Sequence, residues 1–567
     1  MTLEANPLIA ALDAFFQSYY ATRPVNATFT GVHDFDGLLP DWSPAGIERA
    51  RLDMSRLRNL LAHAAPSLGT LGTGSQPDWG LIDATLADAF LDIQLAELET
   101  THFQRGNPSL AVGETAFGLI SLMTRPFAPA SERAHALRAR LDAIPDFLHG
   151  AQRTLAAVPQ RPLWRDKALR ELDGVRILLD RGIPVWCRVE ADGVDLAASL
   201  QRARDAIETF AQWLRLAPVA TDATYGCGEP FLSLLLRRGH WVSDDLESLR
   251  RTWRARLVEE RNRLTDRAHH EHADGWSGVQ AELAVRHPGP DSFYEAFGRI
   301  WHDCHDHAVA RHLVTWPDYP IRYVPIPSWT RDAAPFLYYL FYRSPARFDQ
   351  LQPVEYVVTP IEMAATDEER ARHLRAWNDS VIKLNHVVHH GAIGHHVQNY
   401  YAYRAPSRIG QVAAIDCASR IGMFGGGSMA EGWACYATDL MDEAGFLTPY
   451  ESVAEQHTRV RMLARAIVDI ELHTGRMTLD DAIAFYGEWV GMSPDVARGE
   501  AVKNSMFPGT ASMYWLGTQG IHALRAQVAE RLGTRFDLCT FHDTLLAMGS
   551  IPVRVASELF LRQLPSP

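Results

Sequence analysis

The chain contains no apolar run of 18 residues, and Met1–Pro7 carries no basic segment followed by an apolar one. We therefore expect neither a membrane-spanning helix nor a secretory signal peptide. Like charges do not gather in a block, although the formal net charge is −13. Nucleic acid and anionic membranes are therefore not expected as partners.

Cysteine is scarce, with six residues scattered over 567 and no paired spacing. In a chain of this length the pattern is typical of reduced thiols and predicts a cytoplasmic location. No glycine-rich phosphate loop follows a strand, so nucleotide binding is not expected. With 47% hydrophobic and 22% charged residues, the composition is that of a soluble globular protein.

Helical periodicity fills most of the chain and predicts a mainly α-helical protein. The expected helices cover about 6–20, 43–65, 79–104, 131–157, 163–181, 195–216, 228–268 and most of 367–567. Three runs rich in β-branched and aromatic residues, 321–327, 336–342 and 354–360, predict a small sheet within about 312–360. No linker or repeat divides the chain, so we expect one unit with two lobes, 1–225 and 226–567.

Histidine is concentrated in the segment 385–399, which holds five of the 24 in the chain. Glu431 follows in 429–439, a segment with the pattern of a further helix. A catalytic divalent-metal site needs three protein ligands and one open position. Clustered imidazoles and a later carboxylate supply these ligands, so the two segments together predict a metal centre.

The spacing of the histidines leaves the ligand pair open. The zincin motif His-Glu-x-x-His places its two ligands at i and i+4, on one helix face. The residue four positions after His389 is Ile393, so the strict motif fails there. His386 and His390 do satisfy this spacing.

A distorted helix would allow another pair. His389 and His396 share a face but would lie roughly 10 Å apart along a straight helix. Gly391 and Gly394 bracket the interval, and glycine tolerates a kink or bulge. A break between them could bring His389 close to His395 or His396.

The segment 389–398 reads His-His-Gly-Ala-Ile-Gly-His-His-Val-Gln. It resembles the His-Glu-x-x-Pro-Gly-His-His-Leu-Gln motif of the bacterial family labelled domain of unknown function 885. Further similar segments occur in the family's order at 24–33, 39–42, 431–434, 473–474, 508–517 and 536–543. The resemblance covers nearly the whole chain. It implies a zincin-like (gluzincin) helical metallopeptidase fold, with a small sheet beside a deep central cleft.

The resemblance also implies roles for individual residues. His389, His395 and Glu431 match the metal ligands of related zincins, with His396 as the competing choice for His395. Zinc is the expected metal by ligand type, although iron and manganese also accept histidine and carboxylate sets. Tyr514 lies in a segment that faces the site in relatives, so we expect it to stabilise an oxyanion, with plain packing as the alternative.

Two positions depart from the family motif. The family's catalytic glutamate is His390 here, and its proline is Ile393. In zincins that glutamate is the general base, whereas a histidine can either transfer protons or become a further ligand.

We therefore expect a metal-dependent enzyme acting on a small peptide-like or amino-acid-derived substrate by altered chemistry, as a lyase, an isomerase or an oxygen-using enzyme. One alternative is a metallopeptidase or amidase with His390 as base. Another is a non-catalytic binding protein.

Other residues of ligand type are weaker candidates. The segment 301–307 contains His302 and His305 at the helical spacing i, i+3 but resembles no known site. The segment 269–272 is expected to be a solvated helix end, and His33 to cap a turn or point into the cleft. Cys435 is expected to be a small core residue.

Overall fold

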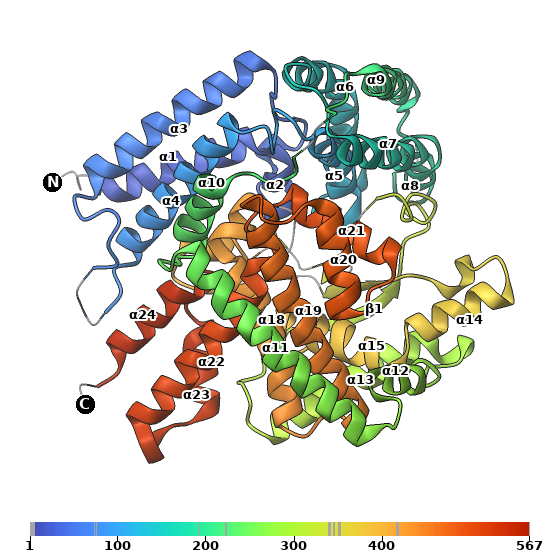
Figure 1. The fold of residues 1–567 in the computed structure, drawn as a ribbon. Helices are drawn as coiled ribbons and strands as arrows, with labels where there is room; N and C mark the ends of the chain where they lie inside the picture. Colours follow the sequence, from blue (N-terminus) through green and yellow to red (C-terminus); the bar gives the residue numbers. More distant parts are fainter. Residues whose placement is uncertain are drawn as a thin grey trace.

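The computed structural model of the chain describes residues 6–565, apart from 73, 75, 192, 222–223, 338–341, 344–345, 350–352 and 415–418. Helices dominate it, as predicted, and Figure 1 shows their arrangement.

The α-helices are α1 (Pro7–Thr22), α2 (Pro24–Thr30), α3 (Pro44–Ala64), α4 (Trp79–Glu99), α5 (Pro108–Thr124), α6 (Ala130–Leu155), α7 (Pro162–Ile177), α8 (Ile183–Glu190), α9 (Ala197–Leu216), α10 (Glu229–Leu234), α11 (Leu246–Glu271), α12 (Gly275–Ala284), α13 (Phe293–Ala310), α14 (Asp367–Ala376), α15 (Asp379–Val381), α16 (His395–Ala402), α17 (Arg408–Val412), α18 (Gly427–Glu443), α19 (Pro449–His473), α20 (Leu479–Val490), α21 (Pro494–Met506), α22 (Ser512–Leu532), α23 (Leu538–Leu546) and α24 (Val553–Gln563). Stretches of π-helix form η2 (Leu178–Gly182), η3 (Leu235–Gly239), η6 (Ile382–Gly391) and η7 (Gly422–Gly426).

Local sequence explains where many helices begin. Asn6 and Ser43 cap α1 and α3 with their side chains, each before a proline at the first helical position. Thr448 and Glu451 form a capping box at the start of α19. The predicted helices of the N-terminal third are confirmed. Helix α5 was missed because it is buried along most of its length and shows no polar face.

The small sheet has the strand order β1-β3-β2, with β1 (Ile321–Pro325) parallel to β3 (Val354–Val358). Strand β2 (Tyr342–Arg343) runs antiparallel to β3. The predicted strands at 321–327 and 354–360 are confirmed. Of the predicted strand at 336–342, residues 336–337 lie in a turn region and Tyr342 begins β2, while 338–341 lie outside the described residues.

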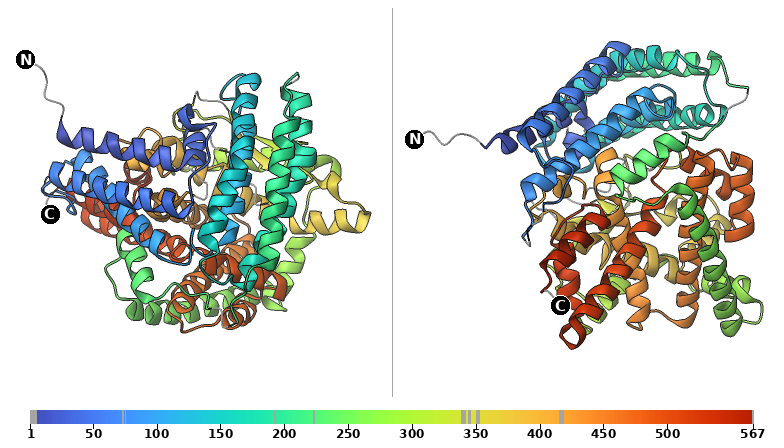
Figure 2. Two further views of the ribbon diagram at one scale, coloured as in Figure 1. Left: turned by 90° about the horizontal axis from the view of Figure 1, so that it is seen from above. Right: turned by 60° about the vertical axis from the view of Figure 1, so that its left-hand side comes forward.

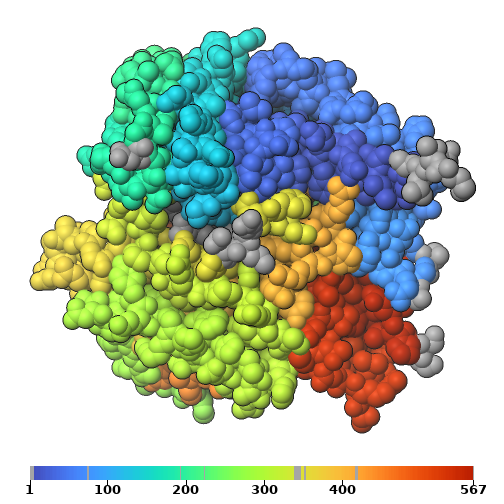
Figure 3. All heavy atoms as spheres, turned by 180° about the vertical axis from the view of Figure 1, so that it is seen from behind, coloured from blue at the N-terminus to red at the C-terminus, as the bar shows by residue number. Residues whose placement is uncertain are grey.

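The helices α1–α9 gather on one side of the molecule, and α11–α24 with the sheet form the other (Figures 1 and 2). On the face seen in Figure 3 the N-terminal helices, in blue to teal, cover the upper half. The core nevertheless runs between the two sides, because Phe15 and Ile82 share one hydrophobic cluster with Trp433. The lobe boundary near 225 stays a prediction. Among the described residues, no helix combines the length and the apolar character needed to cross a membrane.

Helices α18 and α22 approach each other closely where two glycines meet. A Cβ atom on Gly517 would lie 1.9 Å from the carbonyl oxygen of Ser428, and one on Gly432 would lie 2.5 Å from the Cα of Gly517. Side chains at these positions would therefore push the helices apart. The crossing matters for function because Glu431 precedes Gly432 and Tyr514 lies one turn before Gly517.

Gly517→Ala is expected to destabilise the protein by about 1–3 kcal/mol, because the backbone of α18 leaves no room for the methyl group. Gly113→Ala in α5 is the matched control, since nothing lies within 4 Å of its added Cβ. That control should be neutral or stabilising by about 0.5–1 kcal/mol. Urea denaturation of both variants checks the prediction, and equal stability of the two would contradict the close crossing.

Candidate metal centre

The histidine-rich segment is a broken helix, as the two glycines predicted. The π-helix η6 ends at Gly391, and α16 begins at His395 after three non-helical residues. The Gly394 amide donates to the carbonyl of Val388 across the break, at 2.9 Å. A Cβ on Gly394 would lie 1.9 Å from the carbonyl oxygen of His389. Glycine is therefore required there for the chain to fold back on the end of η6.

Two tryptophans hold the broken segment in place. The indole N–H of Trp301 on α13 donates to the carbonyl of Gly391 at 2.7 Å. The indole N–H of Trp433 on α18 donates to the carbonyl of Ile393 at 2.8 Å. The break removes these carbonyls from a regular helical ladder, and buried carbonyls need donors. Neither role was predicted from the sequence, although Trp433 lies in the Glu-Gly-Trp-Ala segment and Trp301 lies beside the second group of histidines.

Glu431 meets two of the histidines across the break. Its Oε2 atom lies 3.5 Å from the Nε2 atom of His389 and 3.5 Å from the Nε2 atom of His395. Ligand atoms bound tetrahedrally to one zinc ion at its usual bond lengths lie about 3.4 Å from each other. Glu431 thus stands at such a separation from each of the two histidines, and the three side chains are of types that bind divalent metals.

His390 belongs to the same cluster. Its ligand nitrogen and those of His389 and His395 all lie within 4.8 Å of one another. The Nδ1 atom of His390 lies 2.6 Å from the carbonyl oxygen of Asn385. Because a carbonyl only accepts, Nδ1 carries the proton and the lone pair is on Nε2. Metal-bound histidines are commonly oriented by such a bond.

The remaining histidines of the segment have other contacts. The Nε2 atom of His396 lies 2.6 Å from the carbonyl oxygen of Tyr319, and the two rings are stacked. His386 accepts from or donates to the hydroxyl of Tyr356 at 2.5 Å and stacks on Trp377. The structure therefore brings His395 rather than His396 to Glu431, and it does not join His386 to His390 as a ligand pair.

The electrostatics of the cluster suit metal binding. Burial lowers the pKa of His389, and burial together with its histidine neighbours holds the pKa of His390 well below the usual range. Burial alone would raise the pKa of Glu431, but His395 and His389 outweigh it and hold that pKa well below the usual range. Neutral imidazole and ionised carboxylate are the forms in which these side chains bind metals.

Tyr514 lies near the start of α22, on the helix that crosses α18. The guanidinium of Arg465 stands 4.6 Å from the centroid of its ring. Tyr514 is half-buried, so solvent reaches part of it. An oxyanion-stabilising role for this residue stays a prediction.

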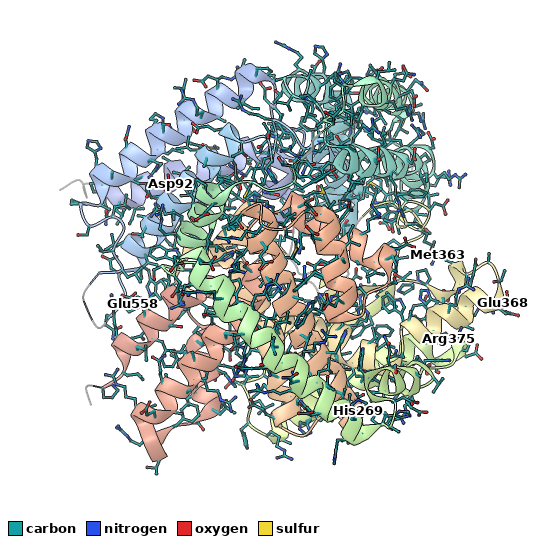
Figure 4. The ribbon with its side chains drawn as sticks, viewed as in Figure 1. Asp92, His269, Met363, Glu368, Arg375 and Glu558 are labelled. Carbon is teal, nitrogen blue, oxygen red and sulfur yellow. The ribbon has the colours of Figure 1, made fainter. Side chains whose placement is uncertain are left out.

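The weaker candidates do not form a second centre. Within the ranges that the structure describes, the one group of three or more ligand-type side chains whose ligand atoms all lie within 4.8 Å of one another is that of His389, His390 and His395, which is part of the candidate centre. His269 lies at the solvent-exposed end of α11, where Figure 4 labels it. Cys435 is buried, with its Sγ atom 3.9 Å from Nδ1 of His389, and burial holds the pKa of its thiol well above the usual range.

His33 joins two distant segments. Its Nδ1 atom lies 2.8 Å from Asp36, and its Nε2 atom lies 2.8 Å from Asp349. Its ring also stacks on Phe127 at a centroid distance of 3.9 Å. Burial alone would lower the pKa of His33, but the hydrogen bonds that its ring N–H groups donate to Asp349 and Asp36 raise it to about 9. His33 is thus an imidazolium that ties the loop after α2 to the segment that follows β2.

This raised pKa predicts a pH-dependent contribution to stability. The contribution is fully present below the unfolded-state pKa of about 6.5 and is lost as the pH rises through about 9. His33→Gln should therefore lower the free energy of unfolding by about 1–2 kcal/mol at pH 6, allowing for solvent screening. Urea titrations at pH 6 and pH 9.5 test this, and a stability difference that persists unchanged at pH 9.5 would contradict it.

Comparison with known proteins extends over nearly the whole chain. The family described as "Bacterial protein of unknown function (DUF885)" matches residues 24–559. A solved structure from Shewanella oneidensis, described as "a putative lipoprotein of unknown function", has a TM-score of 0.76 and 20% identity, covering 98% of this chain and 99% of that one.

A second solved structure, described as a "putative lipoprotein" from Colwellia psychrerythraea, has a TM-score of 0.77 and 16% identity, with 98% of each chain covered. At these identities the likeness shows a shared fold. No curated protein matches the chain. Because the family match spans almost all of the sequence, the chain belongs to the bacterial family DUF885.

Proposed function

We propose that this protein is a metal-dependent enzyme on a zincin-like scaffold, which acts on a small peptide-like or amino-acid-derived substrate. One observation carries the proposal: the Oε2 atom of Glu431 stands 3.5 Å from the Nε2 atoms of both His389 and His395. These residues come from three separate helices, and a glycine-dependent break is needed to bring them together. A π-helix that ends in such a break is less stable than a regular α-helix, and features of this kind are common at functional sites.

His389, His395 and Glu431 would hold the cation, with a ring nitrogen of His390 within 4.8 Å of a ring nitrogen of each of the two histidines. When bound, the cation supplies Lewis-acid polarisation of a substrate group. Zinc is the first expectation for this donor set, and iron or manganese also accept three imidazoles and a carboxylate.

The position of His390 favours a reaction other than hydrolysis. As a fourth protein ligand it would complete a tetrahedral zinc site, which is the arrangement of structural rather than catalytic zinc. A cation that prefers six ligands would instead keep positions for a substrate. A lyase, isomerase or oxygen-using enzyme is therefore the first candidate.

A metallopeptidase or amidase is the second candidate, and one contact favours it. The bond from His390 Nδ1 to the Asn385 carbonyl leaves an Nε2 lone pair that could accept a proton from a nucleophile. In that case His390 would act as the general base in place of the glutamate that the family motif carries at this position.

Metal analysis of protein purified without added metal tests the proposal. Close to one equivalent of zinc, iron or manganese per chain is the expected result. Iron or copper would favour oxygen chemistry, and zinc would favour a hydrolase or lyase. Protein that contains no metal and binds none in titration would overturn the proposal and favour the binding protein.

The cellular location stays a prediction that rests on composition alone. The scattered cysteines predict the cytoplasm, whereas the two solved relatives carry the description of lipoproteins. Thiol labelling of cell fractions from the native host would decide it.

A further inference from the structure

The imidazole of His389 approaches helix α18 with both of its ring nitrogens. Its Nε2 atom lies 3.5 Å from an oxygen of Glu431, and its Nδ1 atom lies 3.9 Å from the sulfur of Cys435. Residues four positions apart on a helix are neighbours on one face, so Glu431 and Cys435 lie one turn apart on the same side of α18. A single turn of this helix therefore contacts both nitrogens of a candidate metal ligand.

Cys435 lies beside the ring nitrogen that would not bind the cation. A cation shared by His389 and Glu431 would bond to the Nε2 atom, because this is the nitrogen that faces the carboxylate. The sulfur approaches the other nitrogen, Nδ1. Among the described residues, the group of ligand-type side chains within 4.8 Å of one another also does not include Cys435. Its place is thus behind a ligand and not among the ligands.

Binding of a cation would decide which nitrogen of His389 carries the proton. A neutral imidazole has one N–H group and one lone pair. When the Nε2 lone pair is given to a cation, the proton is on Nδ1, and this N–H group then faces the sulfur of Cys435. Sulfur is a weak acceptor, and a backbone hydrogen bond with Ala434 acts on His389 from the same turn of α18.

The surroundings hold the sulfur in place and keep water away from it. Cys435 is 6% exposed, so water competes little for the N–H group of His389. Trp433, two residues earlier on α18, donates to the carbonyl of Ile393 in the broken segment. Gly432 packs closely on Gly517 of α22. Helix α18 is therefore fixed both to the histidine segment and to the neighbouring helix.

We infer that Cys435 is a positioning residue of the metal centre, which accepts a hydrogen bond from the Nδ1–H group of His389 and so directs the Nε2 lone pair at the cation. This inference rests on the proposed function for the presence of the cation. Partners that hold the second nitrogen of a metal-bound histidine fix its tautomer and orientation, and their removal typically weakens metal binding by about 10–100-fold. Since sulfur accepts weakly, the lower end of this range is expected for Cys435.

Two substitutions of nearly equal size separate the hydrogen bond from packing. Cys435→Ala and Cys435→Ser leave almost the same space where the sulfur was, but serine keeps an acceptor. The zinc affinity of the full-length protein, measured by competition with a chromogenic chelator, is expected to fall about tenfold in Cys435→Ala and clearly less in Cys435→Ser. Cys539→Ala, which removes a thiol beside Asp543 on α23, is the control and should bind zinc as the wild type does.

Cobalt(II) provides a signature that packing alone would not change. In proton NMR spectra of the cobalt-loaded protein, the ring N–H group of each bound histidine is strongly shifted, and its exchange with water depends on its hydrogen bond. One of these resonances is expected to exchange about tenfold faster in Cys435→Ala, because a hydrogen bond is lost. The other shifted resonances should stay as in the wild type, and Cys435→Ser should restore part of the protection.

The outcomes distinguish this inference from the proposed function. Equal zinc affinity in the wild type and Cys435→Ala would overturn the inference and leave the metal centre in place. Equal losses in Cys435→Ala and Cys435→Ser would show that the sulfur acts by packing and would overturn it as well. A wild type that binds neither zinc nor cobalt(II) would overturn the proposed function and, with it, this inference.

Discussion

Glu431→Gln is expected to weaken metal binding by about 100-fold or more, because removal of a ligand costs at least as much as removal of a supporting contact. Glutamine keeps the size of the side chain and removes the negative charge that stands 3.5 Å from His389 and His395. The metal-to-protein ratio after dialysis, and competition with a chromogenic chelator, give the change in affinity. The fold should survive, since Glu431 lies at the partly exposed side of α18.

Two matched controls accompany this variant. Glu443→Gln alters another carboxylate of α18, which pairs with Arg525 and lies away from the histidines. His302→Asn alters an exposed histidine of the second histidine-rich segment on α13. Both should bind metal as the wild type does. If Glu431→Gln retained full affinity, or if His302→Asn lost it, the assignment of the centre would be wrong.

His390→Glu restores the residue that the family motif carries, and it should change the reaction more than any other single substitution. If His390 binds the metal in a non-hydrolytic enzyme, the native turnover should fall by about 10²–10⁴-fold, and weak hydrolysis of small peptide amides should appear. A carboxylate at this place can act as the general base that hydrolysis needs. The fold should remain intact, because both side chains are polar and His390 is half-buried.

A panel of N-acylated dipeptides, assayed for hydrolysis with metal-loaded protein, measures the outcome. His390→Gln is the control, since glutamine can neither transfer the proton nor act as an imidazole ligand. Hydrolysis by the wild type that is kept or improved in His390→Glu would show a metallopeptidase and refute the first candidate function. Identical rates in wild type, His390→Glu and His390→Gln would remove His390 from the site.

The sequence was sufficient to predict the helices and strands that have strong local patterns. Amphipathic spacing and caps predicted most N-terminal helices, since each such helix buries one face and begins at a residue that satisfies its free amides. The same reasoning failed for α5, because this helix is apolar on several sides and its apolar residues show no helical spacing. Strands β1 and β3 were recognised from β-branched and aromatic runs, but their parallel pairing depends on contacts between residues far apart in the chain.

The sequence also predicted a kink or bulge between Gly391 and Gly394, because a straight helix would keep His389 and His396 about two turns apart. It could not show how the break is stabilised. Trp301 and Trp433 donate to the carbonyls that the break exposes, and both reach it from other helices. Such support becomes visible only when α13 and α18 are placed on either side of the segment.

The amino-acid sequence by itself determined the helical class, the family and the short list of candidate metal ligands, because these depend on local spacing and on motif residues. The tertiary structure decided which of these candidate side chains lie close to one another. It turned His395 toward Glu431 and His396 toward the Tyr319 carbonyl, since successive residues of a helix point in different directions.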